Sequence, residues 1–128
     1  MADGNYPTYV TESKAVIWTV AASAVVRPAG TFVNFAGTNV FTGLGFMGVL
    51  TSDLPANVTN VPVGVDMEGI VQVTSGGAIT LGAPLTCQAL TGEFITAAAG
   101  QDIHGRATIA ATAAGQRILM KITREGKA

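Results

Sequence analysis

The chain has 128 residues, of which 12% are charged and 48% are hydrophobic, and its formal net charge is -1 at pH 7. Disordered chains combine low hydrophobicity with high net charge, so this composition excludes that class, and the length suits one domain with one core. Typical soluble domains carry about 25% charged residues, so this chain has little charge to cover a monomer. The 7 lysines and arginines are scattered and form no basic stripe, which argues against a nucleic-acid partner.

The N-terminal segment, residues 1–12, is polar and has neither helical nor alternating periodicity. Tyr6 and Tyr9 flank Pro7 within it, and tyrosine is enriched at interfaces because it is apolar with a polar tip. We expect an extended arm that docks on another surface, a frayed terminus being the alternative, followed by a single β-domain over 13–128. The segment lacks the basic and apolar regions of a secretory signal, so we expect a protein of the cytoplasm.

The longest charge-free stretch, Pro28 to Ser52, does not read as a membrane span. Threonine, asparagine and glycine residues break every apolar run well short of the ~20 residues that a span requires. Its lack of charge suggests a surface covered by another subunit. The single cysteine, Cys87, cannot form an intramolecular disulfide and is interpreted as a small buried hydrophobe.

Two segments in the first third have strand character. Residues 15–20 are rich in β-branched and aromatic side chains, which favours a strand. Residues 31–36, bracketed by glycines, alternate more weakly, with Phe32 directed to one side and Val33 to the other.

The clearest periodicity lies between Val61 and Val73, where apolar residues occupy one parity and polar residues mostly the other. Side chains alternate faces along a strand, so this pattern predicts a half-buried strand, with Gly69 marking a bulge. Residues 117–123 alternate in the same way.

Glycine-bearing turns separate these segments at 75–78 and 90–93. Two further turns resemble each other, since TAAAGQ begins at Thr96 and TAAGQ at Thr112, which indicates repeated turn chemistry. Only 107–114 has the alanine content for a short helix, and its threonine and isoleucine disfavour one. Many short strands with close turns and little helix predict an all-β fold, a compact barrel or sandwich.

The stretch GLGFMG, Gly43 to Gly48, matches the glycine spacing of dinucleotide-binding loops. That site needs a helix opening on the glycines, and Pro55 would break any helix there after barely two turns. We therefore predict no nucleotide cofactor and interpret Gly48 as the entry of a strand-like segment, GVLT, which GRAT at Gly105 echoes.

The remaining polar residues form no clear catalytic or metal-binding set. No nucleophile elbow accompanies His104, the only histidine, and His104 with Cys87 cannot build a zinc site. Asp66 and Glu68 share one parity of the predicted strand, so they could bind a hard cation or act in acid/base chemistry. We favour two charges that solvate the wet face, and we predict no enzyme, metal or cofactor.

The second half of the chain resembles the small phage capsid decoration proteins, also called cement proteins. In that family a strand leads into a glycine turn, then a Gly-apolar strand, an alanine-rich link and a final alternating strand. The acidic residue often found after the turn glycine is replaced by Ala83 here. The resemblance covers Gly48 to Ile122 and is carried by residues 48–53, 61–73, 77–85, 103–107 and 115–122.

This resemblance implies a non-enzymatic virion protein that binds the exterior of an icosahedral capsid, commonly as a trimer that braces capsid subunits. It implies the major capsid protein and further copies of this chain as partners, with no nucleic acid or membrane. We expect Tyr6, Pro7, Tyr9 and Trp18 to contact the capsid or a neighbouring subunit.

Two other classes of function stay open at this stage. A carbohydrate- or host-surface-binding domain would need Trp18 and the arm tyrosines exposed on one face. We interpret Trp18 and the phenylalanines at 32, 35, 41 and 46 as core, because they are not grouped on one predicted face. A small enzyme would need Asp66, Glu68 or His104 to converge in one pocket.

Overall fold

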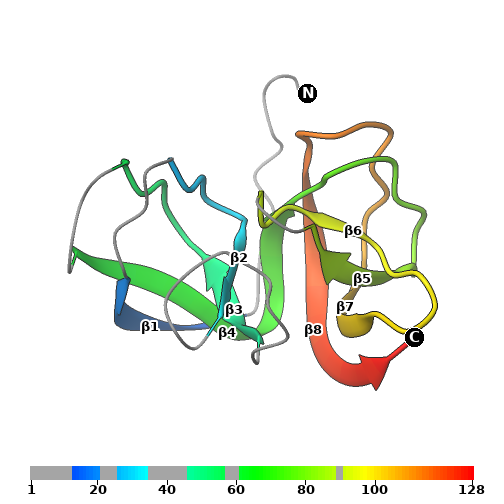
Figure 1. Cartoon of the computed structure of the whole chain (residues 1–128), viewed down its shortest axis with the longest axis horizontal. Coiled ribbons are helices and arrows are strands. Elements are labelled where there is room, and N and C mark those ends of the chain that lie inside the picture. Colours follow the sequence, from blue (N-terminus) through cyan, green and yellow to red (C-terminus); the bar gives the residue numbers. More distant parts are fainter. Residues whose placement is uncertain (1–12, 21–25, 35–45, 57–60, 89–90) are drawn as a thin grey trace.

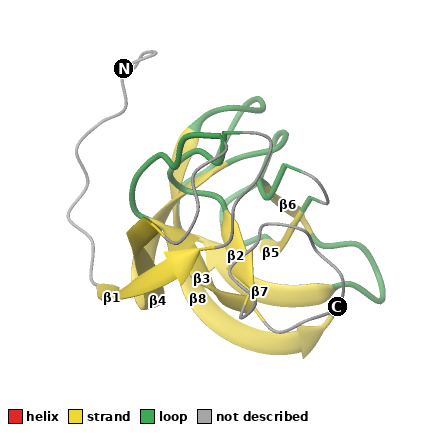
Figure 2. Ribbon diagram, turned by 60° about the vertical axis from the view of Figure 1, so that its left-hand side comes forward, coloured by secondary structure: helices red, strands yellow, loops and turns green. Residues whose placement is uncertain are grey.

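The computed structural model describes residues 13–20, 26–34, 46–56, 61–88 and 91–128 (Figures 1 and 2). This part of the chain contains eight β-strands and no helix, so the predicted all-β class is confirmed, and no helix in it could cross a membrane. The arm, the first half of GLGFMG (residues 43–45), Phe35 and Phe41 lie outside the described residues. The strands are β1 (Ser13–Val20), β2 (Phe32–Asn34), β3 (Phe46–Leu50), β4 (Val61–Thr74), β5 (Pro84–Cys87), β6 (Phe94–Thr96), β7 (Asp102–Ala107) and β8 (Arg117–Lys127).

Seven strands form a nearly closed antiparallel barrel in the order β2-β3-β4-β8-β7-β5-β6, which selects the barrel from the two predicted architectures. The ends of this order meet, because the N–H of Phe32 donates to the carbonyl of Gly92 at 2.8 Å. Ser75, directly after β4, also forms a parallel bridge with Phe94 of β6. β1 lies outside the circuit and pairs with the first half of β4.

β4 changes partners along its length. Its first half pairs with β1 and, around Asp66, with β3, whereas residues 70–74 pair with β8. At the change lies Gly69, whose φ of 93° is in the left-handed region that glycine adopts without steric cost. The register with β1 shifts just before it, opposite Lys14 and Ala15, so the predicted irregularity is confirmed.

The valines on the apolar parity of β4 are buried wherever their side chains are described, as the alternation predicts, and Met67 is partly buried. Val65, Val71 and Val73 are all 0% exposed, and Glu68 on the other parity is exposed. Val65 packs in a smaller cluster and the other two valines in a larger one, so the irregularity between them directs the two halves to different cores.

The two hydrophobic clusters lie on either side of β2. Phe32 belongs to the larger cluster and Val33 to the smaller, and both are essentially unexposed. Residues 30–33 and 48–50 are likewise buried within this chain. Burial in the protein's own core explains why this described part of the stretch 28–52 carries no charge, so the interpretation as a subunit-covered surface is wrong there. Cys87 is 4% exposed, as predicted.

Residues 108–116 form turns and no helix, in agreement with the threonine and isoleucine content of 107–114, and the N–H and carbonyl of Ala111 bond to Ile79 across the fold. One local expectation is corrected. β3 begins at Phe46, so Gly48 lies inside the strand and not at its entry.

Gly48 and Gly105 nevertheless share one packing role. A Cβ atom on Gly48 would lie 2.2 Å from the carbonyl oxygen of Asp66, and one on Gly105 would lie 2.4 Å from that of Lys121. Each oxygen belongs to another strand's backbone, which cannot move aside as a flexible side chain could. The similarity between GVLT and GRAT therefore reflects one glycine in each segment, at a point where the neighbouring strand lies too close for any side chain.

We expect Gly105→Ala to lower the free energy of unfolding by roughly 1–3 kcal/mol, the usual cost of overpacking. Gly77→Ala is the matched control, because nothing lies within 4 Å of its added Cβ and its φ is not in the left-handed region. Urea unfolding monitored by circular dichroism measures both. Equal stability of the two variants would contradict the close-packing account.

Candidate functional site

Two uncharged loops lie next to each other on the barrel. Residues 69–92 and 107–116 contain no charged side chain. Ile79 and Ala111 exchange two backbone hydrogen bonds of 2.9 Å, which join the loop after β4 to the loop between β7 and β8. Both loops run along the upper right of Figure 1. We call residues 76–83 and 108–115 the uncharged rim.

The rim exposes small residues and one large apolar side chain. Its exposed positions are alanine, threonine and glycine, apart from Leu81, which is 71% exposed. Among the described residues the other exposed large hydrophobic residue is Val26. The cores of protein interfaces are depleted in charge and rich in apolar contact, so the rim has the composition of a contact surface.

Ser75 fixes the rim from beneath. It is 0% exposed, and its Oγ donates to the carbonyl of Ala113 at 2.8 Å and accepts the N–H of Gln116 at 3.1 Å. Its backbone N–H donates to the carbonyl of Gln116, and its carbonyl accepts the N–H of Gly115. One buried serine thus connects the end of β4 to the loop before β8.

The two similar turns use the same hydrogen bonds. Gln116 Oε1 accepts the N–H of Thr112 at 2.8 Å, and Gln101 Oε1 accepts the N–H of Ala98 at 2.8 Å. The glycine before each glutamine has a left-handed φ, 83° and 86° respectively. The repeated turn chemistry expected from TAAAGQ and TAAGQ is confirmed, and it makes the rim turn rigid.

We expect Ser75→Ala to lower the free energy of unfolding by about 1–3 kcal/mol, because the buried hydroxyl makes two hydrogen bonds, to the carbonyl of Ala113 and from the N–H of Gln116, that are both lost. Exchange of the Gln116 amide hydrogen should also accelerate. Ser52→Ala, at an exposed serine, serves as the control and should change neither quantity. A Ser75→Ala variant as stable as the control would rule out this anchoring role.

Charged side chains lie along the strands of the β7–β8 hairpin. Arg106 pairs with Glu125 at 2.8 Å, and Lys127 pairs with Asp102 at 3.0 Å. Arg106 also donates to the carbonyl of Gly82 in the rim at 3.3 Å. The hydrogen bond from Arg106 lowers the pKa of Glu125 to about 2, so the carboxylate stays ionised in mild acid. The connecting loop of the hairpin is therefore uncharged, and the Arg106–Glu125 pair borders the rim at Gly82.

His104 is placed for packing rather than for chemistry on a substrate. It is 5% exposed, and its ring stacks on Phe46 with centroids 4.6 Å apart and lies 5.3 Å from Phe32. Burial lowers the pKa of the imidazole to about 4, with a smaller opposing effect of Asp102 and a further lowering by Arg124. The ring is thus neutral at pH 7.

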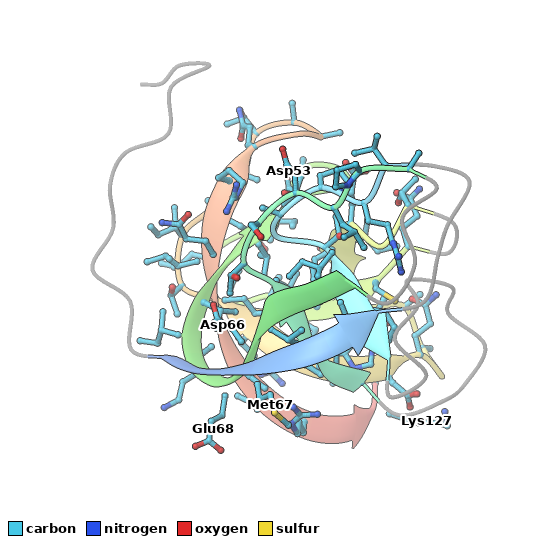
Figure 3. The ribbon with its side chains drawn as sticks, turned by 90° about the vertical axis from the view of Figure 1, so that its left-hand side faces the viewer. Asp53, Asp66, Met67, Glu68 and Lys127 are labelled. Carbon is cyan, nitrogen blue, oxygen red and sulfur yellow. The ribbon has the colours of Figure 1, made fainter. Side chains whose placement is uncertain are left out.

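Asp66 and Glu68 do not form the pair that their spacing allows. Figure 3 shows Asp66 above and Met67 and Glu68 below the ribbon of β1 and β4, because the irregularity in β4 breaks the alternation. Asp66 lines a pocket of about 100 Å³ that neither Glu68 nor His104 lines. No group of three metal-ligating side chains occurs among the described residues. The shared-face interpretation is therefore wrong, and the three residues do not converge.

The expected contact residues stay a prediction. Tyr6, Pro7 and Tyr9 lie outside the described residues, as does the side chain of Trp18, whose backbone in β1 pairs with Val63.

Sequence reasoning missed Leu81 and Ser75, although the absence of charge from 69–92 and 107–116 could have pointed to the loops that carry and adjoin them.

No curated protein matches the chain. A solved structure described as the head fiber gp8.5 N base of bacteriophage phi29 is similar, with a TM-score of 0.61 and 19% sequence identity over 90% of this chain and 98% of that chain, a likeness of fold alone. The model of the phage cement protein family matches residues 10–122. With that match extending over nearly the whole chain, the protein belongs to the phage cement protein family, a structural and non-enzymatic family whose membership implies a role in the phage head.

Proposed function

We propose that this protein binds the outer surface of a phage capsid as a homotrimer and stabilises the head by bridging capsid subunits. The family supports the structural role, and the likeness to a head fiber base supports a fold suited to a virion exterior. The observation that carries the choice of surface is the exposure of Leu81 on loops without charge.

Leu81 is the candidate anchor because it and Val26 are the exposed large hydrophobic residues in the part of the chain that the structure describes. Burying a leucine side chain contributes about 1.5–3 kcal/mol. The rim loops themselves carry no charge, and Arg106, which donates to the carbonyl of Gly82 beside Leu81 at 3.3 Å, is already paired with Glu125. The rim is also held by Ser75, so little ordering accompanies contact.

The arm over residues 1–12 is the second contact that we propose, in front of a β-domain over 13–128. Tyr6, Pro7 and Tyr9 would dock on the capsid or a neighbouring subunit, and Trp18 in β1 would extend that contact. An extended segment can add a strand to an exposed sheet edge. A trimer that combines several weak contacts on one shell gains by effective concentration.

We expect Leu81→Asp to weaken binding to phage heads that lack the protein by tenfold or more, because a carboxylate would enter an apolar contact. Val26→Asp is the matched control, since Val26 is the other exposed large hydrophobic residue, at 56%, and lies outside the rim. Co-sedimentation with heads measures affinity.

Analytical ultracentrifugation of wild type and both variants should give the mass of three chains. A monomeric wild-type protein, or wild-type protein that does not bind the heads, would overturn the proposal. Equal loss of binding in both variants would show that the rim is not the contact surface.

Deleting residues 2–10 should reduce attachment to heads and leave the unfolding midpoint within a few degrees of wild type. The deletion ends before β1, so it removes no described strand. Head binding and thermal unfolding are measured on the same preparation. A truncated protein that fails to fold would show that the segment is part of the domain, and unchanged binding would show that it is no contact.

A further inference from the structure

β7 and β8 are out of register at His104. This one residue of β7 faces residues 123–125 of β8, so β8 bulges there. Arg124, inside the bulge, has a φ of 50°, a left-handed conformation that costs a non-glycine residue of the order of 1 kcal/mol. Bulges redirect side chains, and this one needs contacts elsewhere to hold it.

The Arg124 side chain supplies such contacts across the barrel. Its guanidinium donates to the carbonyl of Phe46 in β3 and, at 2.8 Å, to the carbonyl of Met67 in β4. It also lies over the Phe46 ring, 4.8 Å from the centroid. Figure 3 shows Met67 near the red ribbon of β8. Arg124 therefore fastens the end of β8 to two strands of the opposite half.

His104 and Arg124 contact the same aromatic ring. The imidazole stacks on Phe46 at 4.6 Å, and Phe46 also meets Phe94 edge-on at 6.1 Å. A neutral imidazole fits this enclosed aromatic cluster. A protonated imidazole would be a second cation beside Arg124, in a place too buried for water to solvate it.

We propose that His104, Phe46 and Arg124 form an acid-sensitive lock that fastens the end of β8, residues 123–128, at neutral pH and releases it in mild acid. Protonation of His104 favours any state in which the ring reaches water and moves away from Arg124. The bulge is the element that opens, because its strained backbone is held by the Arg124 contacts.

The other charged groups near the lock determine whether protonation of His104 is favoured or opposed in the closed state. Asp102, on the same strand, favours the protonated imidazole, and Arg124, with Glu68 near it, opposes protonation by like charge. Glu125 is ionised throughout mild acid because of Arg106, and burial raises the pKa of Cys87 to about 12, so neither titrates in the relevant window.

The closed state holds His104 neutral down to about pH 4, whereas a solvated imidazole protonates near 6.5. The open state therefore takes up more protons in this window, and it gains population as pH falls through it.

Hydrogen exchange measured by NMR between pH 7 and pH 4 tests the lock on the full chain, without capsid. The reporters are the amides of residues 123–128, among them Ala128, which donates to Gln101 at 2.8 Å. The reference amides are Ile79 and Ala111 in the rim. After correction for intrinsic rates, reporter protection should fall by up to about tenfold per pH unit between 6.5 and 4, with reference protection retained.

Variants separate the lock from general acid sensitivity. His104→Phe keeps an aromatic ring in the stack and should abolish the fall, with His104→Leu as a second choice if the first does not fold. Arg124→Gln should lower reporter protection already at pH 7. Asp102→Asn and Glu68→Gln should each retain a fall. A fall that persists without His104, or reporter and reference amides losing protection together in wild type, would overturn the proposal.

Discussion

The backbone hydrogen bonds of β4 join the two halves of this barrel. One continuous strand pairs with β1 and β3 along its first half and with β8 along its second, with Gly69 between the two. The two hydrophobic clusters follow from this arrangement, because the valines of each half of β4 belong to different clusters.

Charged residues are unevenly distributed over the barrel. With only 12% charged residues, the chain has ion pairs along the β7–β8 hairpin, Lys127 with Asp102 and Arg106 with Glu125, and leaves the connecting loop uncharged. Surface ion pairs contribute little to stability. The rim loops, 76–83 and 108–115, have only neutral side chains.

The alternation of apolar residues and the repeated turn letters predicted those elements that a short stretch of sequence determines. The alternation from Val61 to Val73 located β4, and the repeated TAAGQ letters located two turns that share their glutamine hydrogen bonds. Pattern failed where partners are distant in sequence. Ser75 bonds to residues near 115, and Arg124 reaches Phe46, so neither role is visible in a short window. The parity of Asp66 and Glu68 was misleading because alternation assumes an uninterrupted strand.

The anchored rim also determines when conformational freedom is lost. Ser75 and Gln116 order the loop before β8 as the domain folds. The loop therefore loses its conformational entropy during folding and not when another molecule binds. Association through a surface of this kind is governed by release of water from alanine, threonine and leucine side chains. It should therefore show a negative change in heat capacity and little dependence on ionic strength.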